Sequence, residues 1–331
     1  MNLPEPWSGS FGLADTTSIT GLPLPGRLKN AFTEKRWCYA GIVSPDLFFG
    51  AAVVHLGYIT SAFCFGFDRT EGRMVEHDVV RPPLGQVRYD LNPETGTCRF
   101  KAPGSRVEIS GDKENRNLVV CTGSGKKSLA ADIDIMPGDF SPMHFPMDMG
   151  EGKKAFTTKA AGMKTAGSVR LGDRQILLDP ENSYALFDWT HGAYHRQTFW
   201  NWTCGAGSGR EKADGGTTAA IGFNFSRGVY ENGTLENTLW VDGQPEPAGA
   251  MTYDYDAKNP LEPWEIVSKD KKISLRFFPE GMRSANDNFG IVASRFIQPC
   301  GRFEGEITTL SGRTFVLEET GGVVEEHFAR W

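Results

Sequence analysis

The chain has 331 residues, of which 39% are hydrophobic and 23% are charged, and its formal net charge at pH 7 is −6. This composition is typical of a globular protein, and the length favours two domains over one. Lys and Arg residues do not cluster along the sequence, so we do not expect a nucleic-acid partner. The N-terminus, Met1–Trp7, has neither a basic start nor an apolar stretch and does not resemble a signal peptide. We therefore expect a cytoplasmic protein.

The most apolar segment, residues 47–67, is close to the length of a membrane-spanning helix. Glycine and polar interruptions, together with the turn residues Ser44–Asp46, predict two buried strands instead, so no integral membrane segment is expected. Further along the chain, alternating apolar and polar residues are joined by short Gly- or Asp-containing turns, which is typical of all-β proteins. Hairpin turns of this kind are predicted at residues 111–116, 172–173 and 242–243.

The C-terminal part continues the pattern. A strand is predicted over residues 273–278, ending at Pro279, and it is followed by four successive strands over residues 293–298, 302–309, 314–318 and 323–330. Repeated hairpins usually close into a barrel or a sandwich. Short helical turns are expected only at residues 26–34 and 182–185. No helix alternates with the strands, which argues against a Rossmann or TIM-barrel architecture.

Two segments show little periodicity, a Met- and Pro-rich one at residues 136–147 and a Gly- and Lys-rich one at residues 150–165. Long irregular segments in a compact protein usually link domains or carry function. We therefore predict a junction there, with an N-terminal β domain over residues 1–165 and a C-terminal β-barrel domain over residues 166–331.

The most informative stretch is residues 188–202, which combines a carboxylate, two imidazoles, a guanidinium and several large aromatic rings. Charged groups among bulky rings are costly to desolvate unless they are paired, so the stretch predicts a cavity where polar groups meet an apolar ligand. The candidate catalytic residues are Asp188, His191 and His195. The candidate substrate-binding residues are Trp189, Tyr194, Arg196, Trp200, Asn201, Trp202 and Glu236.

The spacing of the three candidate catalytic residues leaves their arrangement open. On a helical turn all three would share one face, whereas on a strand Asp188 would point away from both imidazoles. An Asp–His pair suits acid–base chemistry, because the carboxylate fixes the imidazole tautomer and raises its basicity. The same side chains could instead hold Zn²⁺ or be ordinary polar core groups. We favour the acid–base interpretation and expect neither a metal nor a cofactor.

A second pattern concerns carboxylates. Glu231 and Glu236 lie in a polar stretch just before the apolar residues 238–241. Two carboxylates about 5–10 Å apart across a sugar are the basis of glycosidase chemistry. A carbohydrate-active protein is therefore an alternative, although an Asn-Gly pair such as Asn232-Gly233 more often marks a turn.

Five motifs occur in order along the chain: Arg36-Trp-Cys-Tyr, Asp188-Trp-Thr-His-Gly, Thr198-Phe-Trp-Asn-Trp, Glu236-Asn-Thr-Leu-Trp-Val-Asp-Gly and Glu326-His-Phe-Ala-Arg-Trp. With them the chain resembles, over nearly its whole length, a bacterial family known as domain of unknown function 2804. The family has no assigned activity to carry over. A more distant resemblance is to the two-domain lipocalin-like proteins that include carotenoid hydratase, AttH-type proteins and some fungal cyclases.

The distant resemblance implies an all-β fold of two lipocalin-like (calycin-type) antiparallel β-barrels or sandwiches packed side by side. It also implies a hydrophobic or amphipathic small molecule in a barrel or between the domains. The favoured hypothesis is a cofactor-free acid–base enzyme of the hydro-lyase, isomerase or cyclase type, in which Asp188 orients His191 or His195. The alternatives are a non-catalytic protein that binds a hydrophobic ligand, as lipocalin-like barrels commonly do, and a carbohydrate-active protein.

Overall fold

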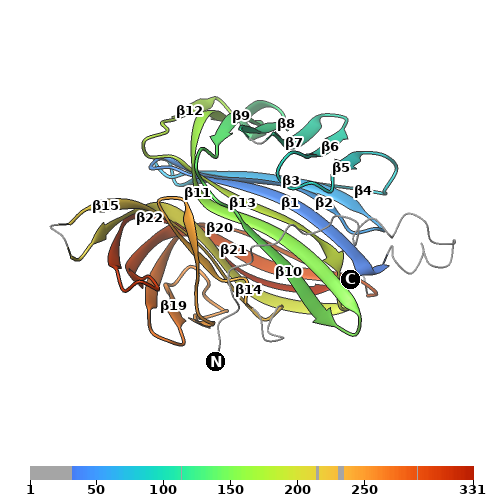
Figure 1. The fold of residues 1–331 in the computed structure, drawn as a ribbon. Coiled ribbons are helices and arrows are strands. Elements are labelled where there is room, and N and C mark those ends of the chain that lie inside the picture. Colours follow the sequence, from blue (N-terminus) through green and yellow to red (C-terminus); the bar gives the residue numbers. More distant parts are fainter. Residues whose placement is uncertain (1–31, 113, 214–215, 230–234, 289) are drawn as a thin grey trace.

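The structure is a computed structural model that describes residues 32–331 except 113, 214–215, 230–234 and 289. Within these residues the chain forms two antiparallel sheets, one of 13 strands and one of 9. Each sheet curls on itself, and the two lie side by side (Figure 1). This confirms the predicted all-β class with two packed halves. None of the helices in the described part of the chain is both long and apolar enough to cross a membrane.

The first sheet has the strand order β4-β3-β2-β1-β13-β11-β9-β8-β7-β6-β5, and β10 and β12 both pair with β11. A short 3₁₀ helix, η1 (Gly125–Lys127), precedes β9. The strands are β1 (Glu34–Val43), β2 (Leu47–His55), β3 (Thr60–Asp68), β4 (Arg73–Arg81), β5 (Val87–Tyr89), β6 (Thr97–Ala102), β7 (Ser105–Gly111), β8 (Arg116–Thr122), β9 (Leu129–Met136), β10 (Met143–Gly150), β11 (Lys153–Leu171), β12 (Arg174–Leu178) and β13 (Tyr184–Ala193).

The second sheet has the strand order β17-β16-β15-β14-β22-β21-β20-β19-β18. Strands that follow each other in the chain are neighbours except β17 and β18, which form the two edges, and β14 pairs with the C-terminal strand β22. The strands are β14 (Gln197–Glu211), β15 (Thr218–Arg227), β16 (Thr238–Val241), β17 (Gln244–Pro247), β18 (Met251–Asp254), β19 (Trp264–Ser268), β20 (Ile273–Asn288), β21 (Ala293–Thr308) and β22 (Thr314–Arg330).

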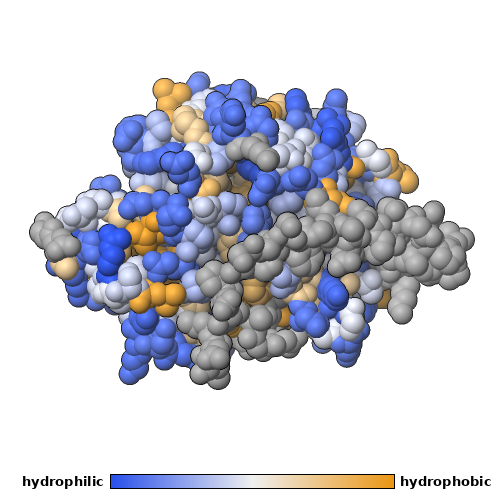
Figure 2. Space-filling view, in the orientation of Figure 1, coloured by the Kyte–Doolittle hydropathy of each residue, from blue (hydrophilic) through white to orange (hydrophobic). Residues whose placement is uncertain are grey.

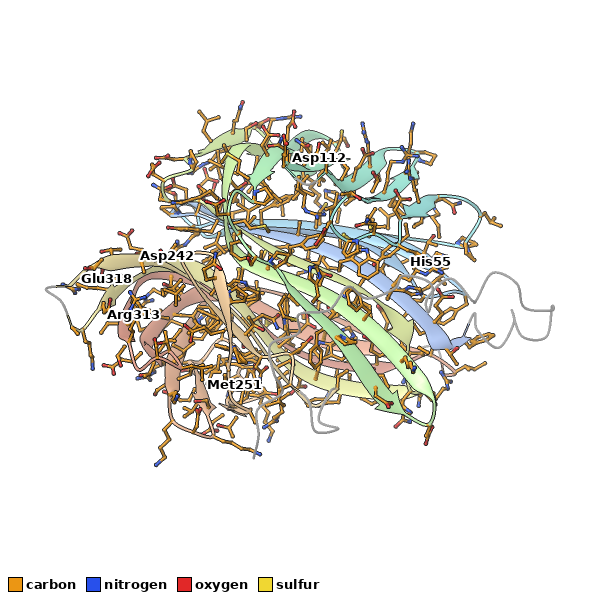
Figure 3. All side chains as sticks on the ribbon, in the orientation of Figure 1. His55, Asp112, Asp242, Met251, Arg313 and Glu318 are labelled. Carbon is orange, nitrogen blue, oxygen red and sulfur yellow. The ribbon has the colours of Figure 1, made fainter. Side chains whose placement is uncertain are left out.

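Among the described residues, three large apolar cores hold this arrangement together, beside a smaller fourth cluster. In Figure 1 strands β5 to β9 fold over β1 to β3, and the first core, with Phe49 and Phe100, fills the space between them. The second sheet curls around its own core, which includes Phe223. A third core lies between the two sheets and joins Phe65 of the first to Trp202 of the second. Side chains occupy the space between the ribbon layers (Figure 3).

The face shown in Figure 2 is mainly hydrophilic among the described residues, and its apolar side chains form small separate groups. Large apolar side chains that remain exposed, such as Leu84 and Leu177, are scattered along the chain. Scattered exposed apolar residues are normal for a folded protein. The functional analysis therefore turns to the buried polar groups.

The two sheets come into backbone contact where β11 packs against β15. A Cβ atom added to Gly222 on β15 would lie 1.7 Å from the carbonyl oxygen of Ala161 on β11. The next residue on β11, Gly162, has a φ of 106° and is the extra residue of a β-bulge. Such a bulge bends a strand and favours glycine. These two glycines let the sheets approach closely.

Several local predictions are confirmed. Residues 47–67 form strands β2 and β3. The predicted turns at residues 111–116, 172–173 and 242–243 join β7 to β8, β11 to β12 and β16 to β17. Asp242 and Gly243 have φ values of 49° and 78°, and positive φ at both central residues is typical of a tight hairpin.

The C-terminal strands are longer than predicted. β20 does not end at Pro279 but continues to Asn288, and the four strands expected after residue 292 are two, β21 and β22. Register shifts at Pro279/Gly281 and Phe303/Glu306 absorb the irregular residues without ending a strand. The expected turn near Gly322 is instead a close backbone contact, because a Cβ there would lie 2.1 Å from the Cys204 carbonyl oxygen.

Of the two segments predicted as irregular, residues 150–165 are largely strand, whereas residues 137–142 of the other connect β9 to β10 without forming a strand. β10 accommodates Pro146 because it pairs only with β11, and an edge strand tolerates a residue without an N–H group. β11 has buried residues on both faces, so its sequence lacks an alternating pattern. Residue 165 lies within β11, and the chain passes to the second sheet between β13 and β14. We propose the domain boundary at that passage, near residue 195.

The helical turn predicted at residues 182–185 is wrong, because β13 begins at Tyr184 and the segment enters a strand. There the strand pairing with a neighbour outweighs the weak local helix preference. In the other segment, residues 26–31 lie outside the described residues, residues 32–33 are helical, and β1 begins at Glu34.

Replacing Gly222 with alanine is expected to lower the free energy of unfolding by about 3 kcal/mol, because the added methyl group has no space between the sheets. Gly312→Ala is the control, since nothing lies within 4 Å of an added Cβ there. Its positive φ alone is expected to cost about 1 kcal/mol. Denaturant unfolding measures both variants, and equal losses would contradict the backbone contact.

Candidate functional site

A lysine lies buried between the two sheets. Lys159 on β11 exposes 5% of its side chain. It pairs across the strands with Asp188 on β13, so both side chains point to the same face of the first sheet. On that face Ala161 and Leu186 pack into the core shared with the second sheet. The lysine is therefore enclosed between the sheets, where a charge must be paired.

Asp188 supplies the main partner for this charge. Lys159 Nζ lies 2.7 Å from Asp188 Oδ2. The same oxygen accepts a hydrogen bond from Trp37 Nε1 at 3.2 Å, and Asp188 Oδ1 accepts one from Thr190 Oγ1 at 3.0 Å. Hydrogen bonds from several donors offset part of the cost of burying a carboxylate. Asp188 thus accepts hydrogen bonds from donors of its own sheet, and these fix its position.

Glu236 brings a second carboxyl group from the other sheet, just before β16. Its Oε2 atom lies 3.8 Å from Lys159 Nζ, and 1% of its side chain is exposed. This distance is too long for a hydrogen bond, and Oε2 accepts none within the described residues. Burial raises the pKa of Glu236; Lys159 opposes this effect and the negative charge of Asp188 adds to it. We call Lys159, Asp188 and Glu236 the inter-sheet charge cluster.

Burial and the neighbouring charges also have opposite effects on the pKa of Lys159. Burial lowers it, but the attraction of Asp188 and Glu236 outweighs burial and raises it overall. The lysine therefore stays a cation. Its closer partner, Asp188, takes the short contact, and Glu236 lies farther away. The two carboxyl groups consequently occupy unequal environments around one cation.

Aromatic side chains bound the inter-sheet charge cluster. Lys159 Nζ lies 5.6 Å from the centre of the Trp202 ring, within the range of a cation–π contact. The Trp202 indole nitrogen donates to Asn224 Oδ1 at 2.8 Å, which fixes the ring. Trp202 also meets the Tyr39 ring edge-on, with 5.8 Å between ring centres. The charged groups thus face an apolar, electron-rich wall.

The two candidate imidazoles do not join the inter-sheet charge cluster. His191 lies on the opposite face of β13, where its Nε2 atom is 2.7 Å from Glu34 Oε1. His195 follows the end of β13, and its Nε2 atom is 2.6 Å from the Met149 carbonyl oxygen. Asp188 therefore pairs with neither imidazole. This is the arrangement that strand periodicity predicts for Asp188 and His191.

The described residues give no support to the alternative of a metal-binding site. That part contains no group of three or more His, Cys, Asp and Glu side chains placed to hold an ion. Asp188, His191 and His195 are separated by the alternation of β13 and by its end. Their spacing in the sequence therefore does not become a shared set of ligands.

The candidate substrate-binding residues lie in several different parts of the structure. Trp189 is buried in the core of the first half, on the face of His191. Tyr194 is buried in a small cluster with Trp331. Arg196 is exposed and donates to the Ile291 carbonyl oxygen. None of these three reaches the inter-sheet charge cluster.

The candidates on β14 alternate between two faces. Trp200 and Trp202 point toward the first sheet, and Trp200 Nε1 donates to Glu325 Oε1 at 2.7 Å. Asn201 points into the second half, where its Nδ2 atom donates to the Tyr255 hydroxyl at 3.0 Å. The structure thus brings together three of the predicted site residues, Asp188, Trp202 and Glu236.

Lys159 is the residue that sequence analysis missed. It lies in the segment predicted as irregular, where a lysine among glycines and other lysines looks like a solvent-exposed residue. A signal was present, because Lys159 is followed by Ala160 and Ala161 in a run of small residues that fits a strand buried on both faces. A charged residue inside such a strand needs a partner, and this requirement could have linked it to a carboxylate.

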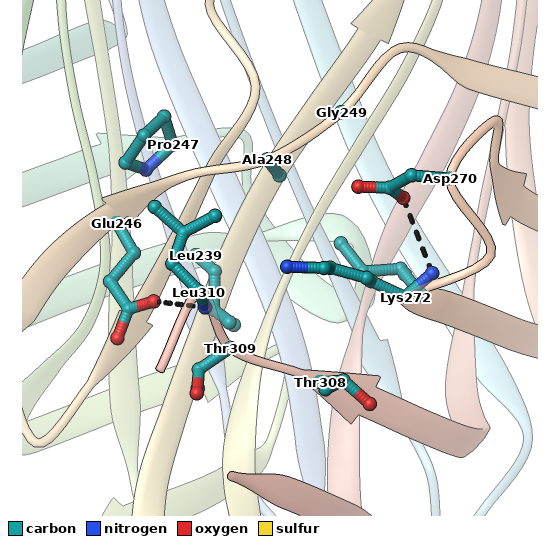
Figure 4. Close-up of a pocket in the computed structure, with 11 residues that line it drawn as sticks. Leu239, Glu246, Pro247, Ala248, Gly249, Asp270, Lys272, Thr308, Thr309 and Leu310 are labelled. Carbon is teal, nitrogen blue, oxygen red and sulfur yellow. Dashed lines mark hydrogen bonds between the residues drawn. The ribbon is translucent and has the colours of Figure 1, made fainter. Parts of the chain in front are cut away.

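A separate small pocket lies in the second sheet, near the β17–β18 connection and the β19–β20 and β21–β22 turns (Figure 4). Its polar groups are already engaged: Glu246 accepts a hydrogen bond from the Leu310 backbone at 2.8 Å, and Asp270 accepts one from the Lys272 backbone at 3.2 Å. None of the predicted site residues lines this pocket. We therefore do not place the chemistry there.

The family model described as "Domain of unknown function (DUF2804)" matches residues 15–331. The chain belongs to this family. The match covers the inter-sheet charge cluster and both sheets, and it confirms the resemblance carried by the five sequence motifs. Among curated proteins, none matches the sequence.

Solved structures resemble the whole chain. A crystal structure of CghA with Sch210972 has a TM-score of 0.55 at 11% identity, covering 91% of this chain and 88% of CghA. An AttH-like protein from Nitrosomonas europaea has a TM-score of 0.49 at 11% identity, covering 92% and 96% of the two chains. Kievitone hydratase from Nectria haematococca has a TM-score of 0.45 at 12% identity, covering 90% and 89%. The likeness to CghA supports the predicted two-domain lipocalin-like fold, and at this identity it shows the fold alone.

Replacing Lys159 with methionine keeps the side-chain length but leaves Asp188 buried without its cation. We expect the free energy of unfolding to fall by about 3–5 kcal/mol. The double variant Lys159→Met/Asp188→Asn should recover part of this loss, because it removes the uncompensated carboxylate as well. A double-mutant cycle by denaturant unfolding measures the coupling. Strictly additive losses would show that the two side chains do not interact.

Proposed function

We propose that the inter-sheet charge cluster is the acid–base site of a cofactor-free enzyme of the hydro-lyase, isomerase or cyclase type. Its substrate would be an apolar or amphipathic small molecule. The observation that supports this best is the sharing of one buried lysine by two carboxyl groups in unequal environments. Carboxyl groups whose surroundings separate their protonation behaviour are typical of acid–base pairs.

Each member of the inter-sheet charge cluster has a distinct part in this proposal. Glu236, whose pKa is raised by burial, acts as the general acid and transfers its proton to an alkene carbon or to a leaving hydroxyl group. Asp188, held by Lys159, acts as the base that takes a proton from the added water or from the neighbouring carbon. Each turnover leaves Glu236 without its proton and Asp188 with an added one, and exchange with water after product release returns both groups to their starting states. Lys159 orients Asp188 and is not itself consumed.

The aromatic wall suits the intermediate of such a reaction. Protonation of an alkene leaves a positive charge on carbon, and the face of an aromatic ring attracts a cation. Trp202 already lies against the Lys159 ammonium group, so its face is turned toward the charged centre. The apolar residues around it would exclude bulk water, which strengthens electrostatic interactions within the site.

The comparison with CghA adds support for a bound molecule. CghA shares the fold of this chain, and its crystal structure was obtained with Sch210972. The alternative of a carbohydrate-active protein has less support, because Glu236 is buried beside Lys159. Its expected partner, Glu231, lies outside the described residues. His191 and His195 do not reach the inter-sheet charge cluster, so we assign them no step in it. The cytoplasmic location stays a prediction of the sequence.

The test is proton exchange in D₂O. Native mass spectrometry of the protein purified from its own host identifies a bound compound, and that compound with its unsaturated and hydroxylated analogues forms the substrate panel. We expect the wild-type protein to incorporate deuterium at carbon. Glu236→Gln and Asp188→Asn should each slow this exchange by at least about 100-fold. Glu262→Gln, which changes an exposed carboxylate, is the matched control and should exchange at the wild-type rate.

Two results would overturn the proposal. Binding of the compounds without any deuterium incorporation would indicate a carrier protein with no chemistry. Exchange at the wild-type rate in both carboxyl variants would place the chemistry outside the inter-sheet charge cluster. Circular dichroism of each variant confirms that a loss of exchange does not come from unfolding.

A further inference from the structure

The other face of β13 carries a second arrangement of polar groups. His191 and Trp189 alternate with Asp188 along the strand and point into the first half, away from the inter-sheet charge cluster. Both are almost fully buried, with 2% and 1% of the residue exposed. Their surroundings are therefore independent of Lys159 and Glu236.

Glu34 determines how His191 presents its ring. The Glu34 carboxylate lies 2.7 Å from His191 Nε2 and is also held by the Arg36 guanidinium, whose Nε atom lies 2.6 Å away. Burial opposes ionisation of Glu34, but the contacts with His191 and Arg36 outweigh it and lower the pKa of Glu34 to about 2. An ionised carboxylate only accepts, so Nε2 carries the hydrogen. In the neutral imidazole Nδ1 is then the acceptor.

Two buried polar atoms on these neighbouring rings have no partner within the described residues. They are His191 Nδ1, which accepts in the neutral imidazole, and Trp189 Nε1, a donor. The two rings meet edge to face with 6.3 Å between their centres. Buried polar groups are nearly always hydrogen-bonded, and leaving one unpaired costs about 1–3 kcal/mol. An acceptor and a donor on these two neighbouring rings are together complementary to a group that both donates and accepts, which is a hydroxyl.

The surroundings favour an aromatic and uncharged ligand. Phe156 and Tyr89 pack around Trp189 with ring centres 6.1 Å and 5.6 Å from its own. The Tyr89 hydroxyl is already occupied, since it donates to the backbone oxygens of Trp37 and Thr190 at 2.8 Å and 2.9 Å. Aromatic rings therefore pack around the Trp189 indole.

Charge balance at the nearby strand ends supports the same conclusion. Glu34 is neutralised by Arg36, and its side chain is 13% exposed, so this end of the sheet is within reach of solvent. His144, which stacks on Phe156, pairs with Glu94 at 3.1 Å. Burial lowers the pKa of His144, so it does not cancel the charge of Glu94, which faces solvent. The carboxylate that contacts His191 is balanced by Arg36.

We propose that the first half contains a second binding site, distinct from the inter-sheet charge cluster, in which His191 Nδ1 and Trp189 Nε1 together hold the hydroxyl group of a neutral phenol-like ligand. Glu34 is a positioning residue, because it fixes the imidazole and does not touch the ligand. The site goes beyond the proposed acid–base function and does not depend on it.

The experiment compares phenol with benzene by NMR of ¹⁵N-labelled wild-type protein. Phenol is expected to shift the His191 Nδ1 resonance and the Trp189 indole N–H resonance, while benzene, which lacks the hydroxyl, leaves the Nδ1 resonance in place. Trp189→Phe should weaken phenol binding by about tenfold and leave benzene binding nearly unchanged. Trp264→Phe, the same substitution in the core of the second half, is the matched control and should bind phenol as the wild type does.

The proposal fails if phenol leaves both resonances unmoved, if benzene shifts Nδ1 as much as phenol does, or if Trp189→Phe binds phenol with wild-type affinity. The comparison of the two ligands in the wild-type protein does not depend on any variant folding. None of these failures bears on the acid–base proposal, since the deuterium exchange of that test depends on Asp188 and Glu236.

Discussion

A lysine buried between two sheets must have its charge balanced, and this constraint organises the middle of the molecule. Lys159 finds one carboxylate on its own sheet and a second carboxyl group on the opposite sheet. Its charge balance therefore depends on the two sheets remaining packed. Two residues further along β11, Ala161 contacts the backbone of Gly222, so close packing and charge pairing occur side by side. A substrate bound at this site would replace some of these buried contacts between charged groups with contacts to the substrate itself.

Much of the fold follows from short-range signals in the sequence. Residues 47–67 and the hairpins are predictable because alternating side chains and turn residues act over a few positions. Strand length is not predictable in the same way. Pro279 resembles a strand end, yet it lies at a bulge within β20, because the neighbouring strand continues past it. β11 is not predictable from local sequence, because a strand buried on both faces lacks the alternation of apolar and polar residues.

The candidate site shows the same division between local and long-range information. β13 presents Asp188 to the space between the sheets and His191 to the interior of the first half, which explains why one stretch mixes acids, imidazoles and rings. Strand periodicity predicts that separation. The partners are not predictable from spacing: the carboxylate that holds His191 is Glu34, 157 residues away in the chain, and Asp188 pairs with Lys159 from another strand. Such pairs exist only once the sheet has formed.

The central claim is that Lys159 holds two carboxyl groups in unequal environments, with Glu236 the one that resists ionisation. A pH titration of the Glu236 side-chain carboxyl carbon by ¹³C NMR measures this directly, with Glu236→Gln identifying the resonance. The account predicts a midpoint above the ordinary value of 4.5 in the wild-type protein and a still higher one in Lys159→Met, because the lysine opposes the rise. A midpoint at or below 4.5, or one that falls when the lysine is removed, would contradict it.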